Sequence, residues 1–256
     1  MTSRPGSSQA HYDGLLAQHY DWMLGDLKVA LEAQLDLLRT LLGEAGEDDG
    51  PRTALDLGCG TGLHSLALRA LGYTSVTCLD VSEQMLTELR HNTHGLVPVT
   101  AMHADLEDGL PATLPAGDFG AAVCMGDTAT HLSGVPALQR LASDVHRVLA
   151  PGGWFALSFR DLTRTPTGAD RFIPVRSDES TILTCFLEDA GDHVAVHDIV
   201  HRRQPDGSWS QQVGSYLKLK LTVPQVESLL TEAGYIELVA RQDARGMHVV
   251  AARTPR

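Results

Sequence analysis

Hydrophobic residues recur at helical spacing near the start of the chain. Residues 1–9 are polar, and we expect them to form a disordered tail. From Tyr12 to Leu24 apolar side chains return every three or four positions, and the spacing resumes after Gly25 from Leu27 to Leu42. This pattern predicts two helices before any strand. Residues 43–51, rich in Gly, Glu and Asp, predict a surface loop after them.

Short apolar runs and amphipathic stretches then alternate along the chain. The predicted strands are Thr53–Leu57, Ser75–Asp80, Val97–Met102, Phe119–Met125, Trp154–Phe159, Ile236–Ala240 and His248–Ala252. The predicted helices are His64–Leu71, Glu83–His91, Ala137–Leu149 and Val223–Ala233. Strands that alternate with helices form parallel sheets covered on both faces. The pattern therefore predicts an α/β fold with a doubly wound, mostly parallel seven-stranded sheet.

A different pattern, strand followed by turn, occupies residues 161–222. The predicted strands are Thr181–Leu187, Val194–Val200 and Trp209–Leu221, separated by the turn sequences Asp-Ala-Gly-Asp (189–192) and Pro-Asp-Gly (205–207). We expect an inserted antiparallel meander, which either roofs a substrate site or pairs two subunits in a homodimer.

Composition and charge exclude several classes of protein. Hydrophobic residues make up 43% and charged residues 20% of the chain, which is a globular composition. The formal net charge of −12 would repel a phosphate backbone, so we expect no nucleic-acid partner. No stretch approaches the ~20 apolar residues that span a bilayer, and the four cysteines are widely spaced. We therefore expect a cytoplasmic protein without membrane contact or disulfide framework.

Three histidines at regular spacing raise the question of a metal site. His193, His197 and His201 share one face of a predicted strand. Steps of four residues separate them by ~13 Å each, so one ion would not reach all three. We predict no metal site and interpret the histidines as part of a solvated sheet face.

A glycine-rich turn follows the first strand. Gly58, Gly60 and Gly62 lie between Leu57 and the next predicted helix. Glycines there allow a sharp turn and close approach of a ligand, where the amides at the start of a helix point outward. The spacing is G-x-G-x-G, whereas the dinucleotide fingerprint requires glycine where Leu63 stands. The turn therefore predicts a nucleoside ligand but weakens the case for a nicotinamide dinucleotide.

Acidic side chains stand near the carboxyl ends of the first three strands. Asp80 closes the second strand, where a carboxylate accepts the hydroxyls of a ribose. Asp105 follows the third strand and is placed to accept from an adenine amine, and Asp56 precedes the glycines, where it would hold a cationic amine directly or through water. Such an acidic edge suits a cationic ligand. S-adenosylmethionine carries both a sulfonium and an ammonium.

At these residues the chain resembles class I S-adenosylmethionine-dependent methyltransferases. The matching segments are Leu-Asp-Leu-Gly-Cys-Gly-Thr-Gly (55–62), Asp80, His-Ala-Asp (103–105) and Leu-Ala-Pro-Gly-Gly (149–153). The resemblance implies S-adenosylmethionine as cofactor and S-adenosylhomocysteine as product. The expected cofactor-binding residues are Tyr20, Trp22, Asp56, Gly58, Cys59, Gly60, Gly62, Asp80, Val81, Met85, Ala104, Asp105, Leu106 and Met125. It further implies a helical lid over residues 1–50, a cofactor-binding core over 51–160 and 223–256, and a substrate cap over 161–222.

A narrower resemblance is to glycine and sarcosine N-methyltransferases. His-Tyr-Asp-Trp-Met (19–23) resembles their N-terminal lid, and residues 126–132 resemble their Gly-Asn-Ser-x-x-His-Leu loop with Asp127 in place of asparagine. Residues 159–161 resemble their His-Arg-Asn stretch with Phe159 in place of histidine. The resemblance implies that Arg160 holds a substrate carboxylate and that Tyr216 faces the substrate.

Each predicted role has a structural alternative. His131 is either a proton acceptor or a residue that caps the next helix, and Asp127 either attracts a cationic amine or caps that helix. Arg160 either binds a carboxylate in two places or pairs with Asp161. Tyr20 and Trp22 either cover the cofactor or pack in the core of an amphipathic helix.

The resulting functional hypothesis is methyl transfer to a small molecule. The expected acceptor is an amine that bears or lies near a carboxylate. The alternatives are a non-catalytic S-adenosylmethionine-binding regulator, an O- or S-methyltransferase, and a nicotinamide-dependent oxidoreductase.

Overall fold

The computed structural model describes residues 11–16, 19–43, 50–94, 98–243 and 246–256. The expected tail over residues 1–9 and most of the loop over 43–51 lie outside these ranges. Contacts divide the chain into two compact units, one of Met1–Gly25 with Leu162–Lys220 and one of Asp26–Asp161 with Leu221–Arg256. We call them the four-stranded unit and the seven-stranded unit. This division places residues 26–50 with the sheet core, whereas the sequence grouped them with the N-terminal lid.

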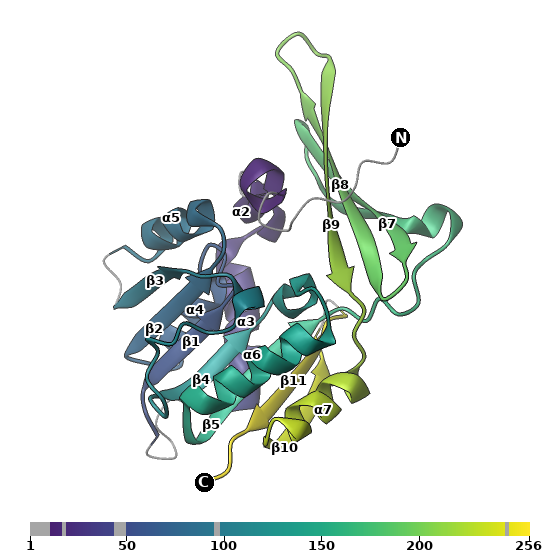
Figure 1. Cartoon of the computed structure of the whole chain (residues 1–256). Coiled ribbons are helices and arrows are strands. Elements are labelled where there is room, and N and C mark those ends of the chain that lie inside the picture. The colour runs from purple at the N-terminus through teal and green to yellow at the C-terminus, as the bar shows by residue number, and fades with distance from the viewer. Residues whose placement is uncertain (1–10, 17–18, 44–49, 95–97, 244–245) are drawn as a thin grey trace. The chain divides into compact units, whose positions relative to one another are not determined.

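The seven-stranded unit contains the predicted doubly wound sheet (Figure 1). Its strands are β1 (Thr53–Leu57), β2 (Ser75–Asp80), β3 (Val99–His103), β4 (Phe119–Cys124), β5 (Leu149–Phe159), β10 (Ile236–Gln242) and β11 (His248–Arg253). They follow the order β10-β11-β5-β4-β1-β2-β3, in which β11 is antiparallel to both its neighbours. Strands β2 and β3 lie on one side of β1, and the next strand, β4, pairs in parallel on its other side. In folds of this kind, ligands bind at the carboxyl ends of the strands where the order switches in this way.

Helices cover the sheet because one face of each is apolar. The helices of this unit are α3 (Leu27–Leu42), α4 (Leu63–Ala70), α5 (Glu83–Asn92), α6 (Val135–Val148) and α7 (Val223–Glu232), with short η3 (Leu106–Asp108) and η4 (Thr128–His131). Buried residues of α3, α4 and α5 share one core cluster with β1, β2 and β4. Figure 1 shows α6 and α7 crossing the other side of the sheet. Gly234 follows α7 in a left-handed conformation, with φ of 96°, which is typical of the residue after a helix.

The four-stranded unit is the predicted antiparallel insertion with one additional strand. Strands β6 (Phe172–Ser177), β7 (Thr181–Ala190), β8 (His193–Arg203) and β9 (Trp209–Leu219) pair in sequence order. Helices η1 (Tyr12–Leu16), α2 (Tyr20–Leu24) and η5 (Gly168–Arg171) belong to the same unit. The predicted turns are confirmed, since Gly191 and Gly207 take φ of 74° and 85°.

Three features differ from the sequence prediction. The first predicted helix corresponds to the two short helices η1 and α2, and residues 17–18 between them lie outside the described ranges. Strand β6 was not predicted, because Pro174 interrupts it and all six of its residues are exposed, as suits an edge strand. Strand β5 begins at Leu149 instead of the predicted Trp154, so Pro-Gly-Gly (151–153) lies within the strand. None of the helices that the described residues form is long and apolar enough to cross a bilayer.

Candidate cofactor and substrate site

The glycine loop after β1 is fixed by hydrogen bonds from its own amides. The amides of Gly58 and Cys59 both donate to the carbonyl of Leu79, at 2.8 and 3.0 Å. The amide of Gly60 donates to Oδ2 of Asp80 at 2.8 Å. These three amides donate within the chain, so they are not available to bind a pyrophosphate. The loop can still let a ligand approach its backbone closely.

Glycine is required at two positions of this loop. Gly58 and Gly62 have φ of 69° and 100°, a left-handed conformation that other residues rarely adopt. A Cβ on Gly58 would collide with the side chain of Thr128, and a Cβ on Gly62 would lie 2.5 Å from Cδ1 of Leu89. The loop is thus packed against the segment after β4 on one side and against α5 on the other.

Asp80 ties the glycine loop to the end of β2. Its Oδ1 accepts from the amide of Ser82 at 2.9 Å, while its Oδ2 accepts from Gly60. Each carboxylate oxygen has a second lone pair, so the predicted acceptance of ribose hydroxyls is compatible with both bonds. Asp80 therefore shapes the glycine loop, and its predicted role in binding a ribose stays a prediction.

Asp56 is fully buried and only half satisfied. Its Oδ2 accepts from the hydroxyl of Ser65 at 2.5 Å, and Sγ of Cys78 lies 3.1 Å from that hydroxyl. Its Oδ1 is buried and has no hydrogen-bond partner among the described residues. Burial raises the pKa of the Asp56 carboxyl to about 7, and the charge of Asp80 adds to this effect, whereas the Ser65 hydrogen bond opposes it. A cationic group is the kind of ligand that would satisfy this oxygen.

Two buried thiols, one in the loop and one at the end of β4, are held in the protonated form. A hydrogen bond with Cys78 and burial raise the pKa of the Cys59 thiol well above its usual range. Burial raises the pKa of Cys124 to about 12. Both thiols are buried and uncharged, so they pack as small apolar side chains.

The segment after β4 joins Asp127 to Arg160. Asp127 is buried and has φ of 74°, and its Oδ1 accepts from the backbone amide of Arg160 at 2.7 Å. Its Oδ2 lies 3.5 Å from Nε of Arg160. The side chain of Asp127 makes no capping hydrogen bond to η4, so the capping alternative is wrong. Asp127 is therefore one partner of Arg160, and the two residues meet because β4 and β5 are neighbouring strands.

Three residues near this edge were not predicted. The hydroxyl of Thr128 donates to the carbonyl of Met125 at 2.8 Å and lies 3.5 Å from the carbonyl of Gly58. Ser158 accepts from the amide of Gly126 at 2.8 Å and so holds the start of the same segment. His64 lies in the first turn of α4 beside Gly126, and burial lowers its pKa to about 4, which keeps the imidazole neutral. Only the histidine next to the glycine motif gave a signal that the sequence could have used.

The other predicted residues of this unit gather around the same strand ends. Asp105 is exposed and accepts from the amide of Glu107 at 2.9 Å, and His131 ends η4. Ala104 and Val81 are half-buried, whereas Leu106, Met85 and Met125 are buried. Their predicted contacts with a cofactor stay predictions.

Tyr20, Trp22 and Tyr216 belong to the four-stranded unit. The indole Nε1 of Trp22 donates to Oδ2 of Asp178 at 2.7 Å, and the guanidinium of Arg176 lies 5.3 Å from the centroid of the Trp22 ring. Tyr216 is 5% exposed and packs in a cluster with Leu187 and Val196. Trp22 thus packs within its own unit, and the cofactor and substrate roles of the three aromatic residues stay predictions.

The three histidines do lie along β8, with His197 2.9 Å from Oε2 of Glu188. Within the described ranges, no group of three or more His, Cys, Asp or Glu side chains is arranged to hold one metal ion.

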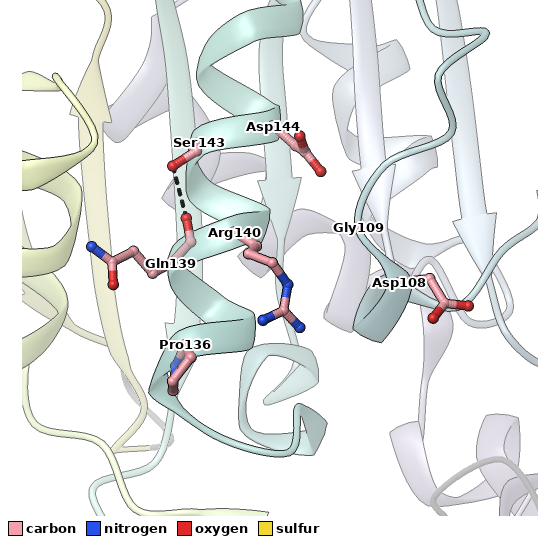
Figure 2. Close-up of a pocket in the computed structure, with 7 residues that line it drawn as sticks. All are labelled: Asp108, Gly109, Pro136, Gln139, Arg140, Ser143 and Asp144. Carbon is pink, nitrogen blue, oxygen red and sulfur yellow. Dashed lines mark hydrogen bonds between the residues drawn. The ribbon is translucent and has the colours of Figure 1, made fainter.

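A separate surface groove of about 480 Å³ lies between α6 and the segment after η3. Figure 2 shows Arg140 extending from α6 toward the segment that carries Asp108 and Gly109. Oδ2 of Asp144 accepts from the amide of Leu110 at 2.9 Å, and Arg140 lies 3.7 Å from Oε1 of Glu107. None of its lining residues belongs to the predicted site, so the groove is distinct from the glycine-loop edge.

The segment that builds this edge matches a known family. Residues 54–153 match the family described as methyltransferase domain. This segment is therefore similar to a methyltransferase domain, and the match covers less than half of the chain. The matched residues run from β1 through the glycine loop and η4 into β5, so they include Asp56, Asp80 and Asp127.

A curated relative matches the same region in part. The ribosomal protein L11 methyltransferase of Paraburkholderia phymatum is 33% identical over 107 residues. This match covers 42% of the present chain and 31% of the relative, so the chain spans less than a third of the relative's length.

Solved structures share the fold along nearly the whole chain. CalS10 from Micromonospora echinaspora, an amino pentose methyltransferase solved with S-adenosylmethionine bound, has a TM-score of 0.71 at 19% identity. The match covers 93% of this chain and 96% of that one. KedS8 from Streptoalloteichus, a sugar N-methyltransferase, has a TM-score of 0.71 at 18% identity and covers 100% and 98% of the two chains. The likeness extends through the four-stranded unit and supports the methyltransferase fold.

Proposed function

We propose that the protein transfers a methyl group from S-adenosylmethionine to an amine of a small molecule. Two observations together carry the proposal. The amides of Gly58, Cys59 and Gly60 donate within the chain, and the buried carboxylate of Asp56 has a hydrogen-bond partner on only one of its oxygens. A phosphate ligand would require free amides, whereas a cationic ligand requires an acceptor such as Oδ1 of Asp56. Asp80 would hold the ribose and Asp105 the adenine.

The protein's part in the reaction is alignment. Bound S-adenosylmethionine supplies a methyl group that its sulfonium already activates. Holding the acceptor in line at a fixed distance contributes ~7–11 kcal/mol toward the barrier, compared with the ~10²–10⁴-fold of a general base. An ammonium acceptor must first lose a proton, and His131 at the end of η4 is the proposed proton acceptor.

The acceptor we propose is an amino sugar. Asp127 already faces the guanidinium of Arg160, which reduces the attraction of Arg160 for a second carboxylate. An amine flanked by hydroxyl groups carries no carboxylate that Arg160 would have to bind. CalS10 and KedS8 are described as an amino pentose methyltransferase and a sugar N-methyltransferase. An amino acid acceptor, in which Arg160 would bridge Asp127 and the substrate carboxylate, is the competing outcome.

A labelled-methyl assay tests the proposal. Purified protein is incubated with methyl-labelled S-adenosylmethionine and a panel of amino sugars, amino acids, hydroxy acids and thiols. The expected product is an N-methylated amino sugar, and the Asp56→Ala variant should give none. Tight binding of S-adenosylhomocysteine without methylation of any amine would contradict the proposed activity.

A further inference from the structure

The first turn of α4 leaves two backbone amides without an acceptor. Helix α4 begins at Leu63, directly after the glycine loop, and the first amides of a helix have no acceptor inside it. The amide of Gly62 donates to the carbonyl of Cys59 at 3.0 Å. The next two amides, those of Leu63 and His64, have no hydrogen-bond acceptor among the described residues. Two donors therefore remain for a ligand at the positive end of the helix dipole.

The carboxylate of Asp56 lies against the same turn. The hydroxyl of Ser65, the third residue of α4, donates to Oδ2 of Asp56. Asp56 is 0% exposed, and its Oδ1 has no partner among the described residues. Ser65 directly follows the two amides that lack an acceptor. An anionic oxygen and two amide donors, all without partners in the described part of the chain, thus meet at the first turn of α4.

The ring of His64 lies at the point where the strand order switches. Gly126 directly follows β4, and a Cβ built on it would lie 4.0 Å from Cε1 of His64. Strands β1 and β4 are neighbours, so this contact places the ring at the carboxyl edge where ligands bind in such folds. The His64 side chain is partly buried and forms no hydrogen bond with the described residues. Burial lowers its pKa to about 4, and a neutral imidazole donates from one nitrogen.

These groups together suit a ligand that carries both charges of an α-amino acid. Its ammonium needs an acceptor, its carboxylate needs donors, and both are bonded to one carbon. A phosphate would be attracted by the two amides but repelled by the carboxylate of Asp56 beside them. An amine without a carboxylate would leave both amides unsatisfied. An amino acid is therefore the ligand class that uses every unsatisfied group of this turn.

We propose that the amides of Leu63 and His64 and the His64 imidazole bind the carboxylate of the amino acid portion of S-adenosylmethionine. Asp56 binds the ammonium of the same portion. The inference rests on the proposed function, which names this cofactor. It adds that His64 determines specificity for the cofactor, because decarboxylated S-adenosylmethionine carries the same reactive methyl group and the same amine but offers His64 no carboxylate.

A set of truncated ligands tests the carboxylate contact by calorimetry. The set comprises S-adenosylhomocysteine, its analogue without the carboxylate, its analogue without the amine, and 5′-methylthioadenosine, which lacks both. The analogue without the carboxylate should bind the natural protein ~10- to 100-fold more weakly than S-adenosylhomocysteine, the range for losing hydrogen bonds to a charged group. Equal affinities for these two ligands would overturn the inference.

Substitution of His64 assigns the contact to this side chain. His64→Ala should weaken binding of S-adenosylhomocysteine by ~10-fold and change binding of the analogue without the carboxylate by less than about twofold. His64→Gln keeps a donor and should restore part of the loss. His91→Ala replaces an exposed histidine on α5 and is the matched control, with no change expected for either ligand. A loss in His64→Ala that is equal for both ligands would make His64 a structural residue and overturn the inference.

Asp56→Asn should give the complementary result. It should weaken binding of both ligands that carry the amine and leave binding of the analogue without the amine nearly unchanged. Equal weakening for all four ligands would show that Asp56 only supports the loop.

A spectroscopic measurement tests the contact in the natural protein, so it does not depend on how the variants fold. The chain has 12 histidines, and the imidazole signal of His64 in histidine-labelled protein is identified by its absence from His64→Gln. S-adenosylhomocysteine should shift this signal, and the analogue without the carboxylate should shift it much less. Equal shifts with both ligands would refute the inference.

The outcomes separate the inference from the proposed function. A protein that methylates an amine but binds its cofactor without regard to the carboxylate would refute the inference alone. Carboxylate-dependent binding through His64, without methylation of any amine, would refute the proposed activity and leave the inference standing. A folded protein that binds no S-adenosylhomocysteine would overturn both.

Discussion

The two units each bury a carboxylate, and they satisfy it differently. Asp56 in the seven-stranded unit has Ser65 on one oxygen and no hydrogen-bond partner among the described residues on the other. Asp198 in the four-stranded unit has Cys185 on one oxygen and His11 on the other. A buried acceptor without a partner is costly, and in the proposed function the cationic cofactor supplies the missing partner. A buried acceptor with both partners present holds protein groups in place.

The largest contrast is expected in stability. Asp198→Ala removes the partner of His11 and should lower the free energy of unfolding by ~3–5 kcal/mol, the range for breaking a buried pair. Asp56→Asn removes a desolvated charge and should leave stability unchanged or higher at pH 8. Urea denaturation of both variants measures the difference. A similar loss of unfolding free energy in the two variants would mean that Asp56 and Asp198 do not differ in how far protein partners stabilise them.

The glycine loop provides the next largest effect. Gly58→Ala places a methyl group against Thr128 and forces the loop to move, which should weaken binding of S-adenosylhomocysteine by ~100-fold. Gly191 has a similar φ of 74° but open space around it, so Gly191→Ala carries the backbone strain alone. Calorimetry on both variants separates strain from collision. Equal weakening would show that the contact with Thr128 is irrelevant to binding.

The raised pKa of Asp56 predicts a pH dependence with a definite sign. Burial raises this pKa from 3.8 to about 7, so the folded protein binds the proton more tightly than the unfolded chain. The associated stability is complete below pH 4 and is lost as the pH rises through 7. The stability advantage of Asp56→Asn should therefore grow from pH 5 to pH 8 in thermal melts.

The same titration should control cofactor affinity. A cationic ligand prefers the ionised carboxylate, so affinity for S-adenosylmethionine should fall by up to about tenfold per pH unit below 7. Asp56→Asn should bind weakly at every pH, without this slope. A slope that persists in the variant would assign the titration to another group.

The smallest expected effect concerns the acceptor. Arg160→Ala should raise KM for the acceptor by about 5- to 10-fold, as for the loss of one ordinary hydrogen bond, and leave the affinity for S-adenosylhomocysteine nearly unchanged. Steady-state kinetics and calorimetry measure the two quantities separately. Equal losses in both would make Arg160 a structural partner of Asp127 only.

The seven-stranded unit was largely predictable because its signals are local. The glycine loop and Asp80 follow adjacent strands, and their meeting at one edge follows from strand alternation. The directions of the loop amides were not predictable, because they depend on which carbonyls β2 presents. The Asp127–Arg160 pair likewise required knowing that β4 and β5 are neighbours.

The contacts of the four-stranded unit were less predictable from the sequence. His11 and Asp198 are 187 positions apart, so no motif or spacing connects them. Strand β6 lacks both burial and alternation, and Pro174 interrupts its pattern. The turns were found because Gly191 and Gly207 mark them locally. What the sequence could not show are the contacts between segments that only folding brings together.

Calorimetric titration with S-adenosylhomocysteine tests the central claim most directly. We expect one molecule to bind per chain, and Asp80→Ala to weaken binding by ~1–3 kcal/mol, the cost of removing an acceptor from buried donors. A folded protein that releases no heat with S-adenosylhomocysteine or S-adenosylmethionine, or an Asp80→Ala variant that binds as tightly as the natural chain, would contradict the account.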